Sequence, residues 1–408
     1  MSNTDTPDHA ATATTAPAPL SNSGGSRVVV AACPSYSPDA VEAALTEVLD
    51  ALGGLETLVK PGQTVLIKPN LLCPRRPEEA VTTHPELVRQ MIRMCVKAGA
   101  ARIWVGDSPA GLHAEKDLWS RTDMTTAVEG TPAELKSWDT KQTPVPCGDD
   151  LLAVPEWFTQ VDVVISLPKL KTHSLTTMTC ALKNVFGITS GLAKSKFHAK
   201  YPSPLTMSTF LVGVFAALRP HVSIVDAVTV MEGLGPANGR PRPLGVLLAS
   251  RDAVALDAVA CAPLRIPPAS VPMIRLAAAR GLGEMDLSRI ECTGTGVPQL
   301  NATRMKPSLA RYLRYIPEPM FRVTTRLFQL RPRIQERQCV KCGICAGVCP
   351  RHAIATQPRS GYPAVNPKEC IVCFCCMESC PRGAIAVQLY LGSMVRLAQR
   401  VGKVVSPQ

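Results

Sequence analysis

Aromatic side chains are scarce in this chain of 408 residues, because Phe, Trp and Tyr together make up only 4% of it. So few of them argue against an extended stacking surface for single-stranded nucleic acid. Long apolar runs are also missing, since the longest clean one, Phe210 to Leu218, is far shorter than the ~20 residues of a membrane span. Residues 1–26 have neither an apolar segment nor an N-terminal positive charge, so we expect no transmembrane helix and no secretory signal.

Acidic residues are sparse beyond residue 303, where 17 basic residues accompany only 4 acidic ones. Residues 1–303 are nearly neutral, with 27 basic and 28 acidic residues, although the whole chain has a formal net charge of +12. This uneven distribution does not fit a uniformly basic nucleic-acid binder, so we expect no nucleic-acid partner. Many of the basic residues fall in an expected connector, 304–337, and an expected amphipathic tail, 389–408. These segments either pack on the domains with their charges in solvent, or contact an anionic membrane surface or an acidic partner.

From Arg27 onward, short apolar segments rich in β-branched residues alternate with amphipathic segments of helical spacing. The expected strands are 28–32, 65–68, 103–106, 162–167, 222–226 and 245–249, and two expected helices are 38–52 and 85–97. This alternation predicts an α/β fold, with a largely parallel sheet and helices on both faces. We assign this domain to residues 27–303 and expect residues 1–26, rich in Thr, Ala, Ser and Pro, to be a disordered tail.

Nine of the 16 cysteines fall between Cys339 and Cys380, in two copies of one motif. Residues 339–349 read CVKCGICAGVC, residues 370–380 read CIVCFCCMESC, and a proline follows each copy. The C-x₂-C-x₂-C-x₃-C-P spacing is typical of proteins with two [4Fe–4S] clusters, in which the fourth cysteine of each copy binds the cluster of the other. The first cluster is then expected to bind Cys339, Cys342, Cys345 and Cys380, and the second to bind Cys370, Cys373, Cys376 and Cys349.

Residues 336–388 resemble bacterial two-cluster ferredoxins, and we place a small α+β ferredoxin-like domain at residues 338–388. A pair of zinc sites is the alternative, but zinc sites usually have two well-separated C-x₂-C pairs. Cys375, beside Cys376, is an extra thiol that is either a bystander or an alternative ligand. The remaining cysteines are scattered, which favours a reducing cytoplasm.

Polar side chains follow several of the expected strands at the points where these strands end. Ligands of open parallel sheets bind at the carboxyl ends of the strands, so we expect these side chains to meet in one site. They are Lys68, Asp107, Lys169, Lys171, His173 and Asp226, with His84, Lys183, Asn184 and His198 as further members. The ammonium groups would bind an anionic substrate, and His173 or His84 would move protons. Asp107 and Asp226 would orient the cations, act as bases or hold a metal; the alternative is a set of solvated loop charges.

Seven segments of the α/β region resemble the domain-of-unknown-function 362 family of bacteria and archaea. They are VLIKPNLL (65–72), THPELV (83–88), GDSPAG (106–111), DVVISLPKLKTHSL (162–175), ALKNVFG (181–187), IVDAVTVMEGLGPANG (224–239) and ASRDAVALDAVA (249–260). Members of the family often carry a C-terminal ferredoxin module, and the resemblance implies no particular reaction. The site residues that it implies are Lys68, Asn70, Asp107, Lys169, Lys171, His173, Lys183, Asn184, Asp226, Asp252 and Asp257, with His198 in a looser part of the pattern.

The leading hypothesis is a cytoplasmic iron–sulfur oxidoreductase that relays electrons through two [4Fe–4S] clusters to a small anionic substrate in the α/β domain. A redox partner protein would exchange electrons with the clusters. The first alternative is a non-catalytic electron-transfer or maturation protein that docks on a redox partner. The second is a non-redox ligand-binding enzyme whose clusters are structural or sense redox state. A flavin or a divalent metal as an additional cofactor, and peripheral contact with a membrane, are left open.

Overall fold

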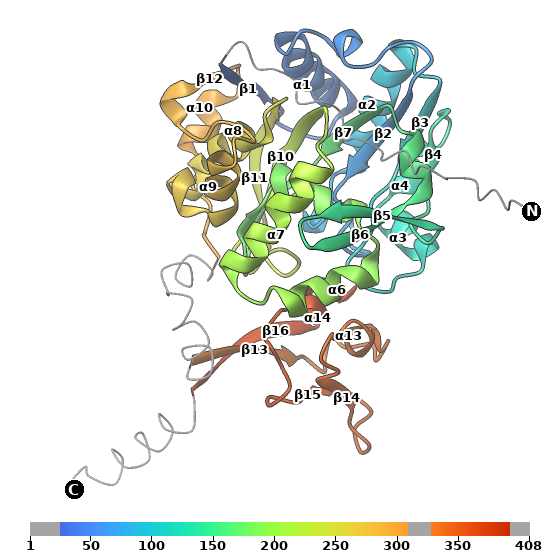
Figure 1. The fold of residues 1–408 in the computed structure, drawn as a ribbon, viewed down its shortest axis with the longest axis vertical. Coiled ribbons are helices and arrows are strands. Elements are labelled where there is room, and N and C mark those ends of the chain that lie inside the picture. Colours follow the sequence, from blue (N-terminus) through green and yellow to red (C-terminus); the bar gives the residue numbers. More distant parts are fainter. Residues whose placement is uncertain (1–24, 309–327, 392–408) are drawn as a thin grey trace, which may run out of the picture.

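The computed structural model describes residues 25–308 and 328–391. Most of the expected tail 1–26, the middle of the expected connector 304–337 and most of the expected tail 389–408 lie outside these ranges. Within them, the chain forms an α/β domain and, after residue 327, a small second domain that lies against one end of the first (Figure 1). None of the described helices has the length and apolar character needed to cross a membrane.

A ten-stranded mixed sheet forms the centre of the α/β domain, in the order β12-β1-β11-β10-β7-β2-β3-β4, with β8 paired to β10 and β9 paired to β8. The strands are β1 (Ser26–Ala32), β2 (Thr64–Pro69), β3 (Arg102–Val105), β4 (Glu134–Leu135), β7 (Val163–Leu167), β8 (Lys169–His173), β9 (Thr177–Thr179), β10 (Val222–Glu232), β11 (Arg240–Ser250) and β12 (Ile290–Thr293). Strands β10, β7, β2 and β3 are parallel neighbours, as expected. The antiparallel exceptions are β11, against β1 and β10, and β9, against β8.

Helices cover both faces of this sheet, as the sequence predicts. Val28 and Val30 of β1 belong to one core with α7, α8 and α9, whereas Val29 and Ala31 point into the other core with α1 and α2. The helices are α1 (Pro38–Ala51), α2 (Pro85–Lys97), α3 (Glu115–Arg121), α4 (Met124–Val128), α5 (Ala181–Asn184), α6 (Gly191–Lys200), α7 (Pro204–Ala217), α8 (Ala253–Val259), α9 (Pro272–Ala279) and α10 (Val297–Ala302). A separate hairpin of β5 (Gln142–Cys147) and β6 (Asp150–Pro155) packs near α7.

Three of the main helices begin in the same way, with a capping side chain followed by proline. The side chains of Ser37, His84 and Ser203 accept hydrogen bonds from backbone N–H groups in the first turns of α1, α2 and α7. The proline after each cap lacks an N–H group, which a helix could not satisfy at that position, and its fixed φ suits the first turn. His84 therefore has a structural role at the start of α2.

The strand that carries most of the expected site residues is interrupted at Pro168. This proline has no N–H group to donate to a neighbouring strand, so it separates β7 from β8. Beyond it, β8 runs parallel to β10, and Lys169 pairs with Asp226 and Lys171 with Met231 across an irregular register. Because β8 stays extended, Lys169, Lys171 and His173 alternate with Leu170 and Thr172, as their spacing predicts.

The second domain consists of two short β-ladders and two short helices. Strands β13 (Phe328–Ile334) and β16 (Ile385–Leu391) pair antiparallel, as do β14 (Ile354–Thr356) and β15 (Pro363–Val365). Helices α13 (Ile344–Gly347) and α14 (Cys375–Glu378) occupy equivalent places in the two cysteine motifs. Strand β13 lies inside the expected connector 304–337, and β16 extends into the expected tail 389–408. Pairing of these strands therefore extends the second domain beyond the expected boundaries of 338–388.

The second domain is held against the carboxyl edge of the sheet by contacts from several loops. Arg75 Nη1 donates to the carbonyl oxygen of Cys380 at 3.4 Å, and Asn238 Nδ2 donates to that of Ile385 at 2.6 Å. Gly111 contributes close packing, because a Cβ atom there would lie 2.8 Å from both Ser379 Oγ and Val348 Cγ1. The α/β domain thus meets both cysteine motifs.

Replacing Gly111 by Ala tests this packing. Gly130 is a matched control, because it also has a positive φ (+71°, against +92° at Gly111) but has open space where a Cβ would stand. Both substitutions lose about 1–2 kcal/mol from the left-handed backbone, and only Gly111→Ala adds an overpacking cost of about 1–3 kcal/mol. We therefore expect the thermal unfolding midpoint of the iron-loaded protein to fall further in Gly111→Ala. Equal midpoints in the two variants would contradict the tight approach of the domains.

Candidate functional site

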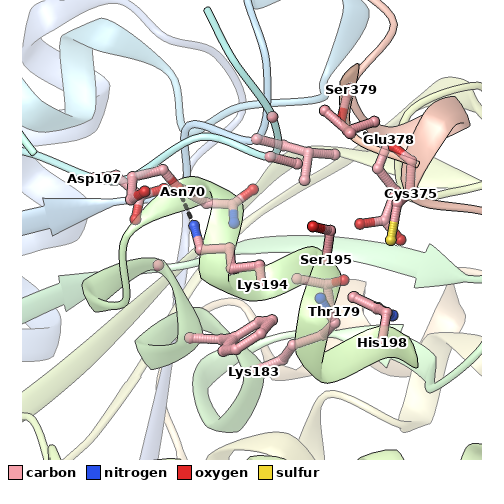
Figure 2. A pocket seen from close by; sticks show the side chains of 18 of the residues that line it. Asn70, Asp107, Thr179, Lys183, Lys194, Ser195, His198, Cys375, Glu378 and Ser379 are labelled. Atoms are coloured by element: carbon pink, nitrogen blue, oxygen red, sulfur yellow. Dashed lines mark hydrogen bonds between the residues drawn. The ribbon is translucent and has the colours of Figure 1, made fainter. Parts of the chain in front are cut away.

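One pocket lies at the boundary between the two domains and encloses about 640 Å³ including its opening to solvent. Five residues expected from the sequence line it: Asn70, Asp107, Lys183, Asn184 and His198. The second domain supplies another part of the wall, with Val348, Cys375, Glu378 and Ser379. Figure 2 shows Cys375 and Glu378 on the side of the pocket opposite Asp107. The site is therefore built by both domains.

Lys68 and Asp107 form a buried ion pair at the wall of the pocket. The Nζ of Lys68 donates to Oδ1 of Asp107 at 2.6 Å, and the other carboxylate oxygen accepts from the N–H of Leu71 at 2.6 Å. Burial lowers the pKa of Lys68, while Asp107 acts in the opposite direction. Gly187 makes room for the pair, because a Cβ there would lie 1.8 Å from Asp107 Oδ1. Asp107 is consequently fixed in position.

Asn70 connects the pocket to a second buried lysine. Its Oδ1 accepts from Nζ of Lys171 at 2.7 Å, and its Nδ2 donates to Oδ1 of Asn184 at 3.2 Å. Lys171 also donates to the carbonyl oxygen of Val81 at 2.7 Å, and burial lowers its pKa to about 7. Lys171 lies behind the pocket wall, where it positions Asn70.

Helix α6 brings two further titratable groups into the wall. Lys194 Nζ donates to the carbonyl oxygens of Ser108 and Pro109, and His198 follows one turn later. Burial lowers the pKa of Lys194 to about 7 and that of His198 to about 4. At neutral pH the imidazole of His198 is therefore neutral, whereas a substantial fraction of Lys194 still carries its proton.

Several polar atoms in the wall have no partner within the described part of the chain. They are Ser108 Oγ, Thr179 Oγ1 and His198 Nδ1, on side chains whose residues are each 3% exposed. The ammonium group of Lys183, which burial gives a lowered pKa, likewise makes no hydrogen bond or ion pair to the described residues. Buried polar groups are normally hydrogen-bonded, so this wall is suited to a polar ligand that accepts hydrogen bonds and carries negative charge.

His173 faces Glu378 across the domain boundary. Its Nδ1 accepts from the N–H groups of Leu175 and Thr176, so the proton of the neutral ring lies on Nε2, 3.2 Å from Glu378 Oε1. Burial lowers the pKa of His173 to about 4. Burial acts to raise the pKa of Glu378, but His173 and nearby Lys183 hold it below its usual value. A neutral imidazole and a carboxylate therefore meet beside the pocket.

Three of the expected residues lie together in a different cluster. Lys169 Nζ donates to Asp226 Oδ2 at 2.9 Å, and Asp226 also accepts from the hydroxyl of Tyr36 at 2.7 Å and from the N–H of His84 at 2.9 Å. The rings of Tyr36 and His84 stack at 3.6 Å, and burial lowers the pKa of His84 to about 4. None of these side chains lines the pocket. This cluster fixes β8 and β10 against α2.

Asp252 and Asp257 serve backbone groups. Asp252 caps α8, where Oδ1 accepts from the N–H groups of Val254 and Ala255. Asp257 is fully buried and accepts from the N–H groups of Ala181 and Leu182, and burial raises its pKa to about 7. Asp257 thus anchors the start of α5, the helix that carries Lys183 and Asn184.

Sequence reasoning missed Lys194, Glu378 and the place of Cys375 in the wall. Lys194 stands four residues before His198, so helical spacing alone places the two on one face. Glu378 had a weaker signal, since it is one of only two acidic residues beyond position 337. No local pattern shows that α14 meets the sheet edge, because that contact depends on how the domains dock.

The structure brings the motif cysteines together in two groups. Cys339, Cys342, Cys345 and Cys380 line a single cavity in the second domain. The thiols of Cys370, Cys373, Cys376 and Cys349 lie near one another, and Cys376 also lies near Cys345. The two copies match in detail, because Cys349 and Cys380 each accept a hydrogen bond at 3.2 Å from the N–H four residues later.

No group of three or more His, Cys, Asp or Glu side chains in residues 25–308 and 328–391 is spaced to hold a single metal ion. A [4Fe–4S] cluster binds each of its cysteines through a different iron, so four sulfurs around a shared cavity fit it without converging on one point.

Comparison with known proteins identifies both domains. A family model described as a domain of unknown function (DUF362) matches residues 65–262, and a 4Fe-4S dicluster domain matches residues 331–381. A thylakoid-associated protein of Synechocystis, sll1697, is 34% identical over 251 residues, which cover 61% of this chain and 77% of that protein. This chain belongs to the DUF362 family. Its C-terminal domain is an iron–sulfur domain, hereafter the cluster domain.

Two solved structures show weak similarity to this DUF362 protein. One is a protein from Thermotoga maritima, with 12% identity and a TM-score of 0.35 over 60% of each chain. The other is the lactate racemase apoprotein from Thermoanaerobacterium thermosaccharolyticum, with 13% identity and a TM-score of 0.38 over 58% of this chain and 56% of that one. The chain spans less than two thirds of either structure, and neither similarity bears on its function.

Anion binding in the pocket is expected to depend on the protonation of Lys194. Because its folded-state pKa is lowered to about 7, the ammonium form is present below this pH and is lost as pH rises through it. We expect the affinity for sulfate, whose charge is constant in this range, to fall by up to roughly tenfold per pH unit above 7. Titration calorimetry from pH 6 to 8.5 measures this dependence. Lys194→Gln, which keeps a donor to the Ser108 carbonyl, should flatten the profile, and an unchanged profile would disprove the assignment.

Single substitutions distinguish the extra thiol from the ligand beside it. The motif spacing makes Cys376 a ligand, so Cys376→Ser should lose about half of the roughly eight irons expected in the native protein. Cys375→Ser, which changes a pocket side chain, should keep them all. Iron and sulfide analysis of anaerobically purified protein decides the matter. If the two variants lose equal amounts of iron, or if only Cys375→Ser loses iron, the second motif is read in the wrong register. If the native protein contains zinc and has no visible absorbance, the assignment of either cysteine set to an iron–sulfur cluster is contradicted.

Proposed function

We propose that this protein is an iron–sulfur oxidoreductase that relays electrons through two [4Fe–4S] clusters to a small anionic substrate in the pocket. The observation that carries the proposal is the composition of one wall. Lys183 from the α/β domain and Cys375 from the second cysteine motif line the same pocket. A substrate bound by the lysine would therefore lie next to the cluster domain.

The residues of the cluster domain suit two clusters that lie close together. We assign the first to Cys339, Cys342, Cys345 and Cys380 and the second to Cys370, Cys373, Cys376 and Cys349. When bound, the clusters would supply one-electron transfer, in two steps where a reaction needs an electron pair. Cys375 precedes a ligand of the second cluster and Val348 precedes another, so the pocket adjoins the second set.

The α/β domain would provide recognition of the substrate. Lys183 and Lys194 offer positive charge, and the hydroxyl groups of Ser108 and Thr179 offer hydrogen bonds. In a site from which much of the water is excluded, such charge-assisted hydrogen bonds hold carboxylate or phosphate oxygens firmly. Lys68 and Lys171 would act from behind the wall, where they fix Asp107 and Asn70.

Two imidazoles are placed to hold protons near the substrate. His198 presents an unpartnered Nδ1, which is a proton acceptor or a donor according to its tautomer. His173 holds its proton on Nε2, which lies 3.2 Å from Glu378 Oε1 without a hydrogen bond between them, and this carboxylate also lines the pocket. Reduction of an organic anion commonly requires protons as well as electrons, and these groups would deliver them. The other expected catalytic residues, His84 and Asp226, would support the fold around β8.

The proposed location is the cytoplasm. The relative from Synechocystis is described as thylakoid-associated, which favours peripheral membrane contact as the alternative. Such contact would use basic residues of the connector and the C-terminal tail, which lie mostly outside the described residues. A redox partner protein is also part of the proposal, because the clusters must be reduced from outside.

Lys183→Ala tests the proposed function. Reduced, anaerobically prepared protein is mixed with anionic fractions of a bacterial small-molecule extract, and return of the oxidised cluster absorbance is followed. A fraction that reoxidises the native protein should act roughly 10–100-fold more slowly on Lys183→Ala, because a hydrogen bond to a charged group contributes about 1.5–3 kcal/mol. Iron content should not change.

Lys60→Ala is the control, since Lys60 precedes β2 at the opposite edge of the sheet. Reoxidation of the native protein by no fraction would contradict a substrate-reducing enzyme and favour the non-catalytic carrier. Equal rates in native protein and Lys183→Ala would contradict the assignment of the pocket.

A further inference from the structure

The cysteines of the first set open onto a surface that is separate from the pocket. The cavity that they line shares no residue with the pocket between the domains. Cys342 is exposed in this cavity, and its neighbour Val340, also in the lining, is 57% exposed. An exposed apolar side chain thus lies next to an exposed cysteine of the first set, where a docking protein could contact both.

Two exposed basic side chains lie at this opening. Arg382 lines the cavity and is exposed, and exposed Lys341 lies between Val340 and Cys342, with Nζ 4.1 Å from the ring centre of Tyr362. We call Val340, Lys341, Cys342 and Arg382 the basic rim. In residues 328–391, seven exposed side chains are basic and two are acidic. The exposed surface of the cluster domain, which includes this opening, is thus complementary to a negatively charged partner.

The two cysteine sets differ in what lies next to them. The second set adjoins the pocket, through Cys375 beside Cys376 and Val348 beside Cys349. The first set has the exposed ligand, Cys342. Electron transfer slows steeply as the distance between centres grows, so a protein donor gains most by docking where a ligand reaches the surface.

From this geometry we propose that the basic rim is the docking site of an acidic one-electron carrier protein, which delivers electrons at the first cysteine set. In each encounter one electron leaves the reduced carrier, which is thereby oxidised by one electron, and reduces the cluster domain by one. No bond is made or broken in this step. The onward path to the pocket rests on the proposed function, but the docking itself does not.

Binding of the holoprotein to an acidic flavodoxin tests the proposal without any substrate. Calorimetry at low salt should detect a complex, and raising the salt to 0.3 M should weaken it at least tenfold, because surface charge pairs are screened. Arg382→Glu and Lys341→Glu should each weaken it at least fivefold at low salt, and Val340→Asp should do the same by removing the apolar contact. Iron content is measured in every variant.

Lys60→Glu is the matched control, with the same change of charge at the opposite edge of the α/β sheet, and it should bind as the native protein does. A basic cytochrome c should not bind. The proposal is overturned if the flavodoxin does not bind, if binding is insensitive to salt, or if the rim variants bind like Lys60→Glu. Docking as expected, together with no Lys183-dependent reoxidation by any extract fraction, would instead count against the proposed function alone.

Discussion

Three lysine side chains are almost fully buried at the carboxyl edge of the sheet: Lys68, Lys169 and Lys171. Because their ammonium groups are removed from water, the neighbouring side chains must lie where they can bind them. A buried charge costs several kcal/mol unless it is paired and hydrogen-bonded. Asp107 and Asp226 pair with Lys68 and Lys169, whereas Lys171 has only hydrogen bonds, one of them to Asn70, and burial lowers its pKa to about 7. Fixing Asp107 in turn requires glycine at position 187. Lys183 is the contrasting case, because its ammonium group has no such partner in the described residues and lines the pocket.

The pocket exists because the cluster domain stands against this edge. Without α14, the part of the wall that the α/β domain supplies would face solvent, and its unpartnered polar atoms would bind water. With it, a carboxylate and a thiol from the second cysteine motif complete the enclosure. Arg75 and Asn238 donate hydrogen bonds across the domain boundary, and Gly111 contributes by allowing close approach of the backbone. Under the proposed function, substrate binding and electron arrival would both depend on this one interface, and a small shift in it would alter both.

The sequence predicted the parts of the site that follow from strand order. Polar residues after β2, β3 and β7 meet because these strands are parallel neighbours, and the pairing of Lys68 with Asp107 follows directly. The sequence analysis also expected Lys169, His84 and Asp226 in this site. They instead form a separate buried cluster with Tyr36. No sequence pattern indicated that the hydroxyl group of Tyr36 would bind Asp226. Asp252 and Asp257 were expected in the site because they lie in a segment that resembles the family, but both accept hydrogen bonds from backbone N–H groups. Glu378 could not be found, because docking between domains depends on surfaces assembled from distant segments.

The two halves of the cluster domain differ in their surroundings. Duplication would make its two halves equivalent, and the matched N–H···S contacts at Cys349 and Cys380 show how closely they correspond. Packing against the α/β domain removes this equivalence, because α14 is buried in the interface whereas the loop around Cys342 stays exposed. The second motif accordingly contains buried Cys375 and Glu378 where the first has the more accessible Ile344 and Gly347. The second motif thus has side chains suited to the wall of the pocket, and the first has side chains suited to an exposed surface. An electron carrier with two equivalent halves would not need this difference.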